Sequence, residues 1–510
     1  MNNNKQYIIA QDIGIYSCKA ALFTFDGEMV RSNKVCYAPN VTEEGWSSES
    51  PHFWWEAFCI NCRQLLTDIS PQAVRAVCVC GQMMGCLPVD GNGQPLYDYI
   101  TWDDKRSIAQ IRKIESLLGA KIIHAITGVC LSHMFSLSKI MWLKENHPDV
   151  YNATVCFLQC KDYINYRLTG IMTTDTSDAG FTMMYDLEKQ QWSDTILDAC
   201  GIAGEKMPEV VHFGTALGKV TAEAARECGL SQGTVVVEGM GDGRAPMVGS
   251  GLKYKGEGLI HLGSVSWISQ VTNSIKMDKK GVLTKSAFTE PGLLLNGGTV
   301  LSGGLSVQWF LKTFYPISPY PSQGLLQELF EKMGRTPIGS HGLLFMPYLR
   351  GERTPWWNNY AKGGFIGLDM YHTRDDFFRS VIEGISLQLT IAKNCIEELE
   401  PFISMYLTGG NVTPQWQQLL SDILELDIIS TDIKENCGCQ GAAVAAGVGI
   451  GIYKDYSEAV RFHHQHYCTS PIKENVEVYR ELLPAFEDCY NALQDINLYL
   501  SRIHCKRTKI

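Results

Sequence analysis

Two stretches of the chain, far apart, share one pattern of hydrophobic and polar positions. The first, YIIAQDIGIYSCKAALFTFDGEMV from Tyr7, predicts a strand, a break at Asp12-Ile13-Gly14, and a second strand that ends before the turn Asp26-Gly27. The second, GEGLIHLGSVSWISQVTNS from Gly256, predicts a strand, a break at Gly263-Ser264 and another strand. Two such β-meanders suggest a chain built from two related halves, although their residues differ.

Amphipathic helices alternate with strands between and after the meanders. In PHFWWEAFCINCRQLLTDI the apolar residues recur about every 3.6 positions, and Ser50 followed by Pro51 predicts the start of this helix. The strand AVRAVCVCG follows it. Further on, the predicted helix DDFFRSVIEGISLQLTIAKNCIEEL precedes the strand SMYLTGG and the helix PQWQQLLSDIL. This alternation indicates an α/β fold with helices on the faces of the sheets.

Length and glycine content predict the division into domains. A chain of 510 residues is longer than a single hydrophobic core usually supports, and the Gly-rich stretch 249–258 separates the two halves. We expect an N-terminal domain over residues 1–250 and a C-terminal domain over residues 251–455. The last segment, 456–510, is expected to be a helical extension packed on the second domain.

The charge balance and the apolar runs exclude several classes of function. The formal net charge is −10 and no long basic run occurs, so the chain is not expected to bind nucleic acid. The N-terminus lacks the pattern of a signal peptide, and GAAVAAGVGIGIY is shorter than the roughly 20 apolar residues that a membrane span needs. The 18 cysteines lie scattered in apolar runs, which favours reduced thiols in the core. These features predict a cytoplasmic protein without membrane contact.

The segment EGMGDGRAPMVGSG, from Glu238 to Gly251, could form either a phosphate-binding loop or a turn that presents Asp242. Neither the Walker A spacing nor G-x-G-x-x-G occurs in the chain, which weakens the first interpretation. Glycine-containing turns of this kind expose backbone amides to anions, and carboxylates at strand ends suit Mg²⁺. They recur after predicted strands in both halves, at residues 12–14, 241–243, 263–264, 303–304 and 409–410. Together they suggest a nucleotide held in a cleft between two domains.

Several segments, in their order along the chain, resemble the FGGY carbohydrate kinases and within them the xylulokinase-like branch. WSSESPHFWW is similar to the family's W-S-x-x-x-P-x-x-W-W, GQMMG to G-Q-M-H-G, and ITWDDKR to L-W-N-D-x-R. KDYINYRLTG, TTDTSDAGFTMMYDL, FMPYLRGERTP and KGGFIGL also resemble family segments, so that the resemblance covers nearly the whole chain. It implies two ribonuclease H-like domains of the actin and hexokinase type, with the active site in the cleft between them. It also implies a kinase that transfers the γ-phosphoryl group of ATP, with Mg²⁺, to a hydroxyl of a pentulose or related sugar.

The resemblance assigns Asp242 as the general base that takes the proton of the sugar hydroxyl. The alternative from the residues alone is an aspartate that stabilises its own turn. Asp12, with Gly14, matches the position beside the metal ion and the phosphates, and Gly263 with Ser264 matches a second phosphate loop.

Two further groups of residues follow from the resemblance. Positions that hold adenosine and phosphate are matched by Gly304, Gln308, Gly409 and Gly410, although each of these glycines could simply separate a helix from a strand. The sugar-binding positions are matched by Gln82, Met83, Met84, Trp102, Asp103, Asp242 and Gly243. Met83 and Met84 could equally be core residues.

The sequence departs from the family pattern at positions that would contact the ligands. Ile15 and Tyr16 replace the hydroxyl residues of the first phosphate loop, and Val265 replaces one in the second. Met84 replaces the histidine of the sugar turn, while Gly243 replaces an asparagine and is followed by Arg244. These changes predict altered sugar specificity, because a site that loses a hydrogen-bond partner discriminates differently.

Three questions remain open from the sequence. Arg244 could pair with Asp242 or Asp103, or it could meet an acidic substrate. Because the phosphate loops are altered, a second function stays open. The chain would then be a degenerate kinase that binds sugar or nucleotide as a regulator without turnover. The oligomeric state is open as well, with a homodimer among the alternatives.

Overall fold

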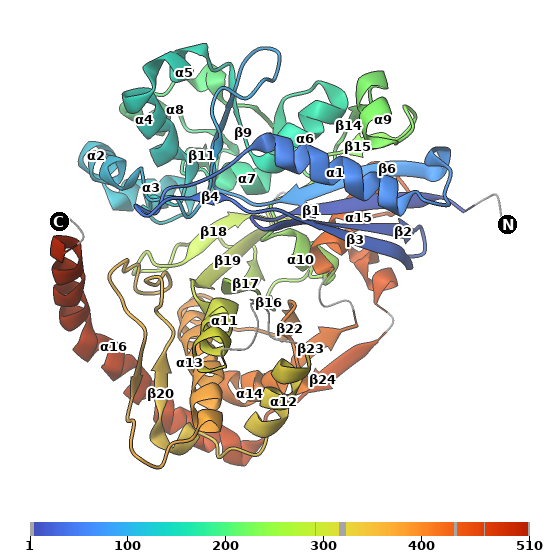
Figure 1. Cartoon of the computed structure of the whole chain (residues 1–510). Coiled ribbons are helices and arrows are strands. Elements are labelled where there is room, and N and C mark those ends of the chain that lie inside the picture. Colours follow the sequence, from blue (N-terminus) through green and yellow to red (C-terminus); the bar gives the residue numbers. More distant parts are fainter. Residues whose placement is uncertain (1–4, 291, 316–322, 433–435, 464, 508–510) are drawn as a thin grey trace.

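Two mixed β-sheets, one in each half of the chain, form the centres of two lobes that face each other (Figure 1). The computed structural model describes residues 5–290, 292–315, 323–432, 436–463 and 465–507. None of the described helices is long and apolar enough to span a membrane.

The first sheet has the strand order β14-β15-β6-β1-β2-β3. β1, β2 and β3 form an antiparallel meander, while β6 lies parallel to β1 and β15 lies parallel to β6. The bounds are β1 Tyr7–Ile13, β2 Ser17–Thr24, β3 Met29–Cys36, β6 Val74–Gly81, β14 Ala216–Lys219 and β15 Val235–Val237.

The second sheet, with the order β18-β19-β17-β16-β22-β23-β24, repeats this connectivity. β16, β17 and β19 form the meander, and β22 and β23 continue the sheet in parallel from β16. The bounds are β16 Glu257–Leu262, β17 Ser266–Thr272, β18 Thr284–Ala287, β19 Leu294–Val300, β22 Ser404–Thr408, β23 Ile428–Thr431 and β24 His466–Thr469. Both predicted meanders and the predicted fold of two ribonuclease H-like domains are therefore confirmed.

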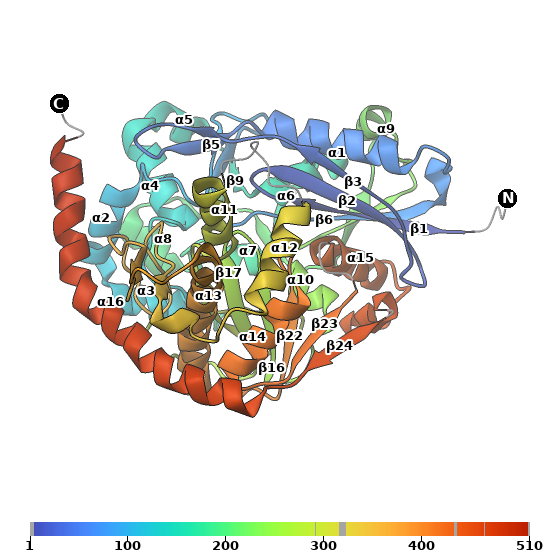
Figure 2. The same ribbon diagram turned by 60° about the horizontal axis from the view of Figure 1, so that its bottom comes forward.

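Helices cover the sheets. In the first half they are α1 Pro51–Leu65, α2 Ile108–Leu118, α3 Ala120–Thr127, α4 Ser136–Asn146, α5 Pro148–Ala153, α6 Cys160–Thr169, α7 Thr176–Gly180, α8 Asp194–Cys200, α9 Ala222–Cys228 and α10 Ala245–Gly249. In the second half they are α11 Gly303–Phe314, α12 Gln323–Met333, α13 Arg374–Glu397, α14 Pro414–Leu424, α15 Cys437–Gly449 and α16 Lys473–Arg507. α16 runs along the outside of the second lobe, where it contacts α13 and α14 (Figure 2).

Short elements complete the two lobes. The remaining strands are β4 Asn40–Val41, β5 Ser47–Glu49, β7 Leu87–Val89, β8 Tyr99–Ile100, β9 Cys156–Leu158, β10 Thr173–Asp175, β11 Tyr185–Asp186, β12 Gln191–Trp192, β13 Glu209–Val211, β20 Leu344–Met346 and β21 Gly364–Ile366. Short 3₁₀ helices lie at Pro71–Ala73, Gly204–Lys206, Ser340–Gly342 and Tyr456–Phe462.

The local predictions hold for α1, α13, α14 and β22, with one difference in detail. Ser50 precedes α1 and Pro51 opens it, but the Ser50 side chain makes no capping hydrogen bond. The segment 456–510 is less helical than expected, because it contains a 3₁₀ helix and the strand β24 before α16 begins. β24 forms because its backbone pairs with β23 at the edge of the second sheet, a tertiary contact that overrides local preference. The bounds of the domains stay a prediction.

The two lobes meet where α10, which follows β15, crosses α15, which follows β23. α15 lies against β1 and β6 of the first sheet (Figure 1). The crossing is so close that a Cβ atom on Gly441 would lie 1.9 Å from the carbonyl oxygen of Ala245, and one on Gly249 would lie 2.5 Å from that of Cys437. Backbone contact between these helices therefore joins the two lobes.

Gly441→Ala is expected to destabilise the protein. Alanine favours a helix over glycine by about 1 kcal/mol, but the added Cβ forces α10 and α15 apart, at a cost of about 1–3 kcal/mol or more. Thermal unfolding should show a lower Tm than the wild type. Gly364→Ala in β21 is the control, because a Cβ atom there meets nothing within 4 Å. An unchanged or higher Tm for Gly441→Ala would contradict this account of the crossing.

Candidate active site

A cavity of about 370 Å³ lies between the two lobes, where the loops that follow β1, β6 and β15 face the loop that follows β16 and the strands β17, β18 and β19. The structure brings most of the predicted site residues together on its walls: Asp12, Met83, Met84, Trp102, Asp103, Asp242, Gly243, Gly263 and Ser264. The other predicted residues, Gly14, Gln82, Gly304, Gln308, Gly409 and Gly410, are not part of this lining. The predicted cleft is therefore present. The first group of residues forms its surface, whereas the second group lies outside the lining.

The turn that carries Asp242 is held against the end of β6. The Asp242 N–H donates to the carbonyl oxygen of Gly81 at 2.8 Å, and the Gly241 N–H donates to Ser177 Oγ at 2.9 Å. A Cβ atom on Gly239 would lie 1.7 Å from the carbonyl oxygen of Val79, so only glycine permits this approach. These two amides are engaged within the protein, and the turn presents a carboxylate to the cavity.

The Asp242 carboxyl has a strongly altered proton affinity. Burial raises its pKa to about 8, and the negative charge of Asp12 contributes in the same direction. Burial also raises the pKa of Asp12, while Lys19 and the Cys80 thiol act against that shift. Because burial and the charge of Asp12 both disfavour the ionised form of Asp242, this carboxyl can exchange its proton close to neutral pH.

Asp12 is surrounded by residues of both lobes. It pairs in the β1–β2 register with Lys19, which also lines the cavity. From the second lobe, the first turn of α15 approaches so closely that a Cβ atom on Gly438 would lie 2.7 Å from Asp12 Oδ2. Among the described residues no group of three or more His, Cys, Asp or Glu gathers as a metal site. Asp12, as a carboxylate at the cavity wall, nevertheless fits Mg²⁺, which commonly uses one or two carboxylates together with phosphate and water.

Gly304 and Gly409 lie directly behind the Gly263-Ser264 turn. The Gly304 N–H donates to the carbonyl oxygen of Gly263 at 2.9 Å, and a Cβ atom on Gly304 would lie 2.5 Å from that oxygen. Gly409 has a φ of 117°, and a Cβ atom there would lie 2.5 Å from the carbonyl oxygen of Leu262. Both glycines therefore shape the turn from behind, whereas Gln308 and Gly410 are exposed.

The other end of the cavity is lined by Trp102 and its neighbours. Asp103 forms a 2.8 Å ion pair with Arg350, which crosses from the second lobe. The guanidinium carbons of Arg350 and Arg353 lie 5.8 and 5.5 Å from the Trp102 ring centroid. Burial acts to raise the pKa of Asp103, but hydrogen bonds from Arg350 and Thr101 act to lower it. The pKa of Asp103 is lowered overall.

Gln82, Met83 and Met84 form the turn after β6. Gln82 is buried, and its Nε2 donates to Glu49 Oε2 at 2.7 Å, so it supports the turn from the interior. Met83 packs against Gly241, and Met84 adopts a left-handed backbone with a φ of 70° at the cavity wall.

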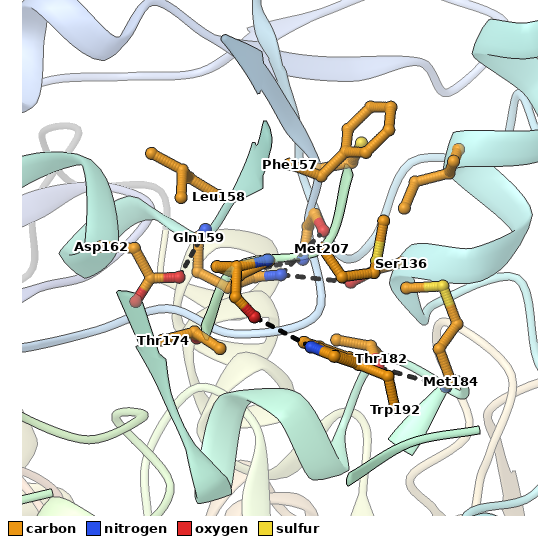
Figure 3. A pocket seen from close by; sticks show the side chains of 14 residues that line it. Ser136, Phe157, Leu158, Gln159, Asp162, Thr174, Thr182, Met184, Trp192 and Met207 are labelled. Carbon is orange, nitrogen blue, oxygen red and sulfur yellow. Dashed lines mark hydrogen bonds between the residues drawn. The ribbon is translucent and has the colours of Figure 1, made fainter. Parts of the chain in front are cut away.

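A second, much smaller cavity of about 10 Å³ lies inside the first lobe (Figure 3). Gln159 spans it, donating from Nε2 to Ser136 Oγ at 3.2 Å and from its backbone N–H to Asp162 at 2.9 Å. Its Oε1 accepts from the Gly85 N–H at 3.1 Å, which fixes the residue after Met84. This volume is close to that of one water molecule, so the cavity is too small to bind a substrate.

The position of Arg244 corrects one sequence-based alternative. Among the described residues it pairs with neither Asp242 nor Asp103; its guanidinium donates to Ser286 Oγ on β18 and lies 5.2 Å from the Phe181 ring centroid. The sequence interpretation also missed residues that line the cavity, namely Lys19, His261, Trp267, Arg350, Arg353 and Gly438. The segment FMPYLRGERTP, which contains Arg350 and Arg353, was the signal that could have drawn attention to them.

The chain resembles known carbohydrate kinases over nearly its whole length. The models of the FGGY family of carbohydrate kinases match residues 7–249 with the N-terminal domain and residues 265–450 with the C-terminal domain. The chain is 31% identical to a xylulose kinase of Lactococcus lactis subsp. lactis (strain IL1403), over 96% of this chain and 98% of that protein. It is 26% identical to a gluconokinase of Bacillus subtilis (strain 168), over 96% of both chains.

Solved structures extend the similarity to three dimensions. A gluconate kinase and a ligand-bound xylulose kinase, both from Lactobacillus acidophilus, each superimpose with a TM-score of 0.88 at 25% identity. Each alignment covers 96% of this chain, with 99% of the gluconate kinase and 98% of the xylulose kinase.

In the ligand-free protein the Asp242 carboxyl should release its proton near pH 8, because burial and Asp12 disfavour its charge. Infrared difference titration of the wild type against Asp242→Asn measures this group directly. Asp12→Asn should move the titration to lower pH, since it removes a nearby negative charge. Titration of Asp242 at the ordinary value of an aspartate would contradict the described electrostatics.

Proposed function

The chain belongs to the FGGY family of carbohydrate kinases and phosphorylates a sugar with ATP, and we propose that Asp242 is the general base of this reaction. The observation that carries the proposal is the Asp242 carboxyl at the cavity wall, with its pKa raised to about 8. A base with a pKa near the working pH is effective at accepting a proton during the transfer.

The proposed reaction is a direct transfer between two bound substrates. The sugar hydroxyl gives its proton to the Asp242 carboxylate while its oxygen forms a bond to the γ-phosphorus of ATP. The bond between that phosphorus and the β–γ bridging oxygen breaks, and ADP leaves with the bond's electron pair. Most of the acceleration in such a reaction comes from positioning and from neutralising phosphate charge.

The phosphates of ATP are proposed to lie between the two β-turns that face each other in the cleft, Asp12–Gly14 and Gly263-Ser264. Lys19 on β2 supplies a positive charge beside the first turn. The backbone amides at the start of α15, near Gly438, would also attract the phosphates, because the N-terminus of a helix carries a partial positive charge.

The remaining nucleotide contacts are proposals as well. Gly304 and Gly409 would act through the turn that they support, and Gln308 and Gly410 would lie beside the adenosine. Mg²⁺ bound at Asp12 would offset phosphate charge and lower the proton affinity of the neighbouring carboxyl.

The acceptor sugar is proposed to bind between Trp102 and the turn of Met83 and Met84. Gly243, beside the base, leaves space there, and Asp103 is available to hydroxyl groups. The xylulose kinases among the relatives support a pentulose or a related sugar as the acceptor, and the gluconokinases widen the range to acidic sugars.

Asp242→Asn should lower kcat by about 10²–10⁴-fold, because the amide keeps the shape of the side chain but cannot take the proton. Coupled ADP-release kinetics measure this, and calorimetry should give an unchanged affinity for ATP. Asp68→Asn is the control, because Asp68 is exposed and remote from the cavity. Turnover of Asp242→Asn within tenfold of the wild type would exclude Asp242 as the base. A wild type that binds sugar or ATP but turns over no sugar would instead support the regulator without turnover.

Gly304→Ala should raise the KM for ATP by about tenfold or more, because its Cβ would displace the Gly263-Ser264 turn. The KM for the sugar should change far less, since the turn lies at the other end of the cavity. Steady-state kinetics with each substrate varied in turn separate the two effects, with Gly364→Ala as the control. Equal changes in both KM values would argue against a role of this turn in nucleotide binding.

A further inference from the structure

His261 lies near the cavity end of β16, the strand that leads into the Gly263-Ser264 turn. β16 lies between β17 and β22 in the second sheet (Figure 1). Alternate residues of a strand share one face, so His261 points to the same side as Leu259, which is buried in a core cluster that both lobes build. His261 itself is partly exposed and lines the cavity. The imidazole therefore faces the first lobe at the point where this core ends and the cavity begins.

The neighbouring strands fix the orientation of the imidazole ring. His261 pairs in register with Trp267 of β17 and with Thr408 of β22. The Trp267 ring stacks on the imidazole, with 5.3 Å between the ring centroids and 18° between the ring planes. Nδ1 of the imidazole lies 3.2 Å from Thr408 Oγ1, within hydrogen-bond distance. Nε2 lies beside the phosphate turn, since a Cβ atom on Gly263 would lie 3.0 Å from it.

The His261 Nε2 atom makes no hydrogen bond to any residue that the structure describes. Burial and the positive charge of Lys19 lower the pKa of His261 to about 4, so the imidazole is uncharged near pH 7. A neutral imidazole has one N–H donor and one acceptor nitrogen. When the Thr408 hydroxyl donates to Nδ1, the proton of the ring lies on Nε2. His261 then offers an N–H donor to the cavity.

The surroundings of this donor suit an anion with several acceptor oxygens. Lys19 of the first lobe lines the same cavity, and its charge acts on His261 across it. The side chains of Ile15 and Val265, in the two proposed phosphate turns, line the cavity too but have no hydrogen-bond donor. A phosphate group would meet both the charge of the lysine and the N–H of the imidazole.

We propose that His261 is a nucleotide-binding residue, whose Nε2–H donates to a phosphate oxygen of ATP while Nδ1 accepts from the Thr408 hydroxyl. The imidazole supplies a side-chain donor beside a turn in which Val265 offers none. The stacked Trp267 ring and Thr408 hold the imidazole in place before ATP binds, so little side-chain freedom is lost on binding. The inference rests on the proposed function, because it takes the phosphates of ATP to lie at the Gly263-Ser264 turn.

Two variants separate the hydrogen bond from the packing of the ring. His261→Phe keeps an aromatic ring against Trp267 but removes both nitrogens, whereas His261→Gln loses the ring but keeps an N–H donor in its amide. Calorimetry should show that His261→Phe binds ATP with Mg²⁺ about 10–100-fold more weakly than the wild type, the usual effect of losing a hydrogen bond to a charged group. His261→Gln should bind at least about fivefold more tightly than His261→Phe. His52→Phe in α1 is the control, because His52 is exposed and lies outside the cavity lining.

A series of nucleotides locates the contact on the ligand. His261→Phe should bind adenosine within about threefold of the wild type, because adenosine has no phosphate. The shortest of AMP, ADP and ATP whose binding is weakened identifies the phosphate that His261 contacts. The KM for the sugar should stay within about threefold, since the proposed sugar site lies at the other end of the cavity.

The wild type gives a further test if the His261 variants do not fold. Diethyl pyrocarbonate acylates neutral histidines, and peptide mass spectrometry measures the modification of His261 alone. Saturating ATP with Mg²⁺ should lower the rate at which His261 is modified by about tenfold or more, whereas His52 should react at an unchanged rate. Equal rates at His261 with and without ATP would contradict the proposed contact.

Three results with the variants would overturn the inference. Binding of ATP by His261→Phe within about threefold of the wild type would show that the nitrogens are not needed. Equal losses in His261→Phe and His261→Gln would show that the imidazole acts only through packing. An equal loss for adenosine and ATP would place the contact on the nucleoside. Failure of the proposed function itself differs from all of these, because the wild type would then bind ATP but phosphorylate no sugar, or would not bind ATP.

Discussion

The active cleft depends on the contact between the turn after β15 and the end of β6. The Asp242 N–H donates to the carbonyl oxygen of Gly81, and Gly239 and Gly241 lack the side chains that would separate the two strands. This contact sets Asp242 within the electrostatic reach of Asp12, two strands away in the same sheet. The altered proton affinity of Asp242 follows from that placement and from burial between the lobes.

The second lobe contributes close backbone contacts, rather than acidic side chains, to the cleft. Gly438 at the start of α15 reaches the Asp12 carboxylate, and Gly304 and Gly409 support the turn opposite it. At the other end, two arginines of the second lobe, Arg350 and Arg353, lie over Trp102. The cavity therefore has one end with exposed turns and a lysine, suited to phosphates, and one end with guanidinium groups and aromatic rings, suited to the acceptor.

The sequence was sufficient for the fold and for the residues at strand ends. Alternating hydrophobic positions predicted both meanders, and glycine-flanked acids after strands marked Asp12 and Asp242. Contacts that exist only after the lobes meet could not be predicted this way. The approach of Gly438 to Asp12 and the arrival of Arg353 beside Trp102 are set by the crossing of α10 and α15 and by the fold of a distant loop. β24 was missed for the same reason, because it forms by pairing with β23.

The pH dependence of kcat/KM, with ATP and the acceptor both far below saturation, tests the central claim most directly. Under these conditions the profile reports the free enzyme, in which the base must be deprotonated to act. The raised pKa of Asp242 predicts that kcat/KM increases tenfold per pH unit on the acid side and levels off above about pH 8. A profile that is flat from about pH 6 to pH 9 would contradict the assignment of Asp242 as a base tuned by burial and by Asp12.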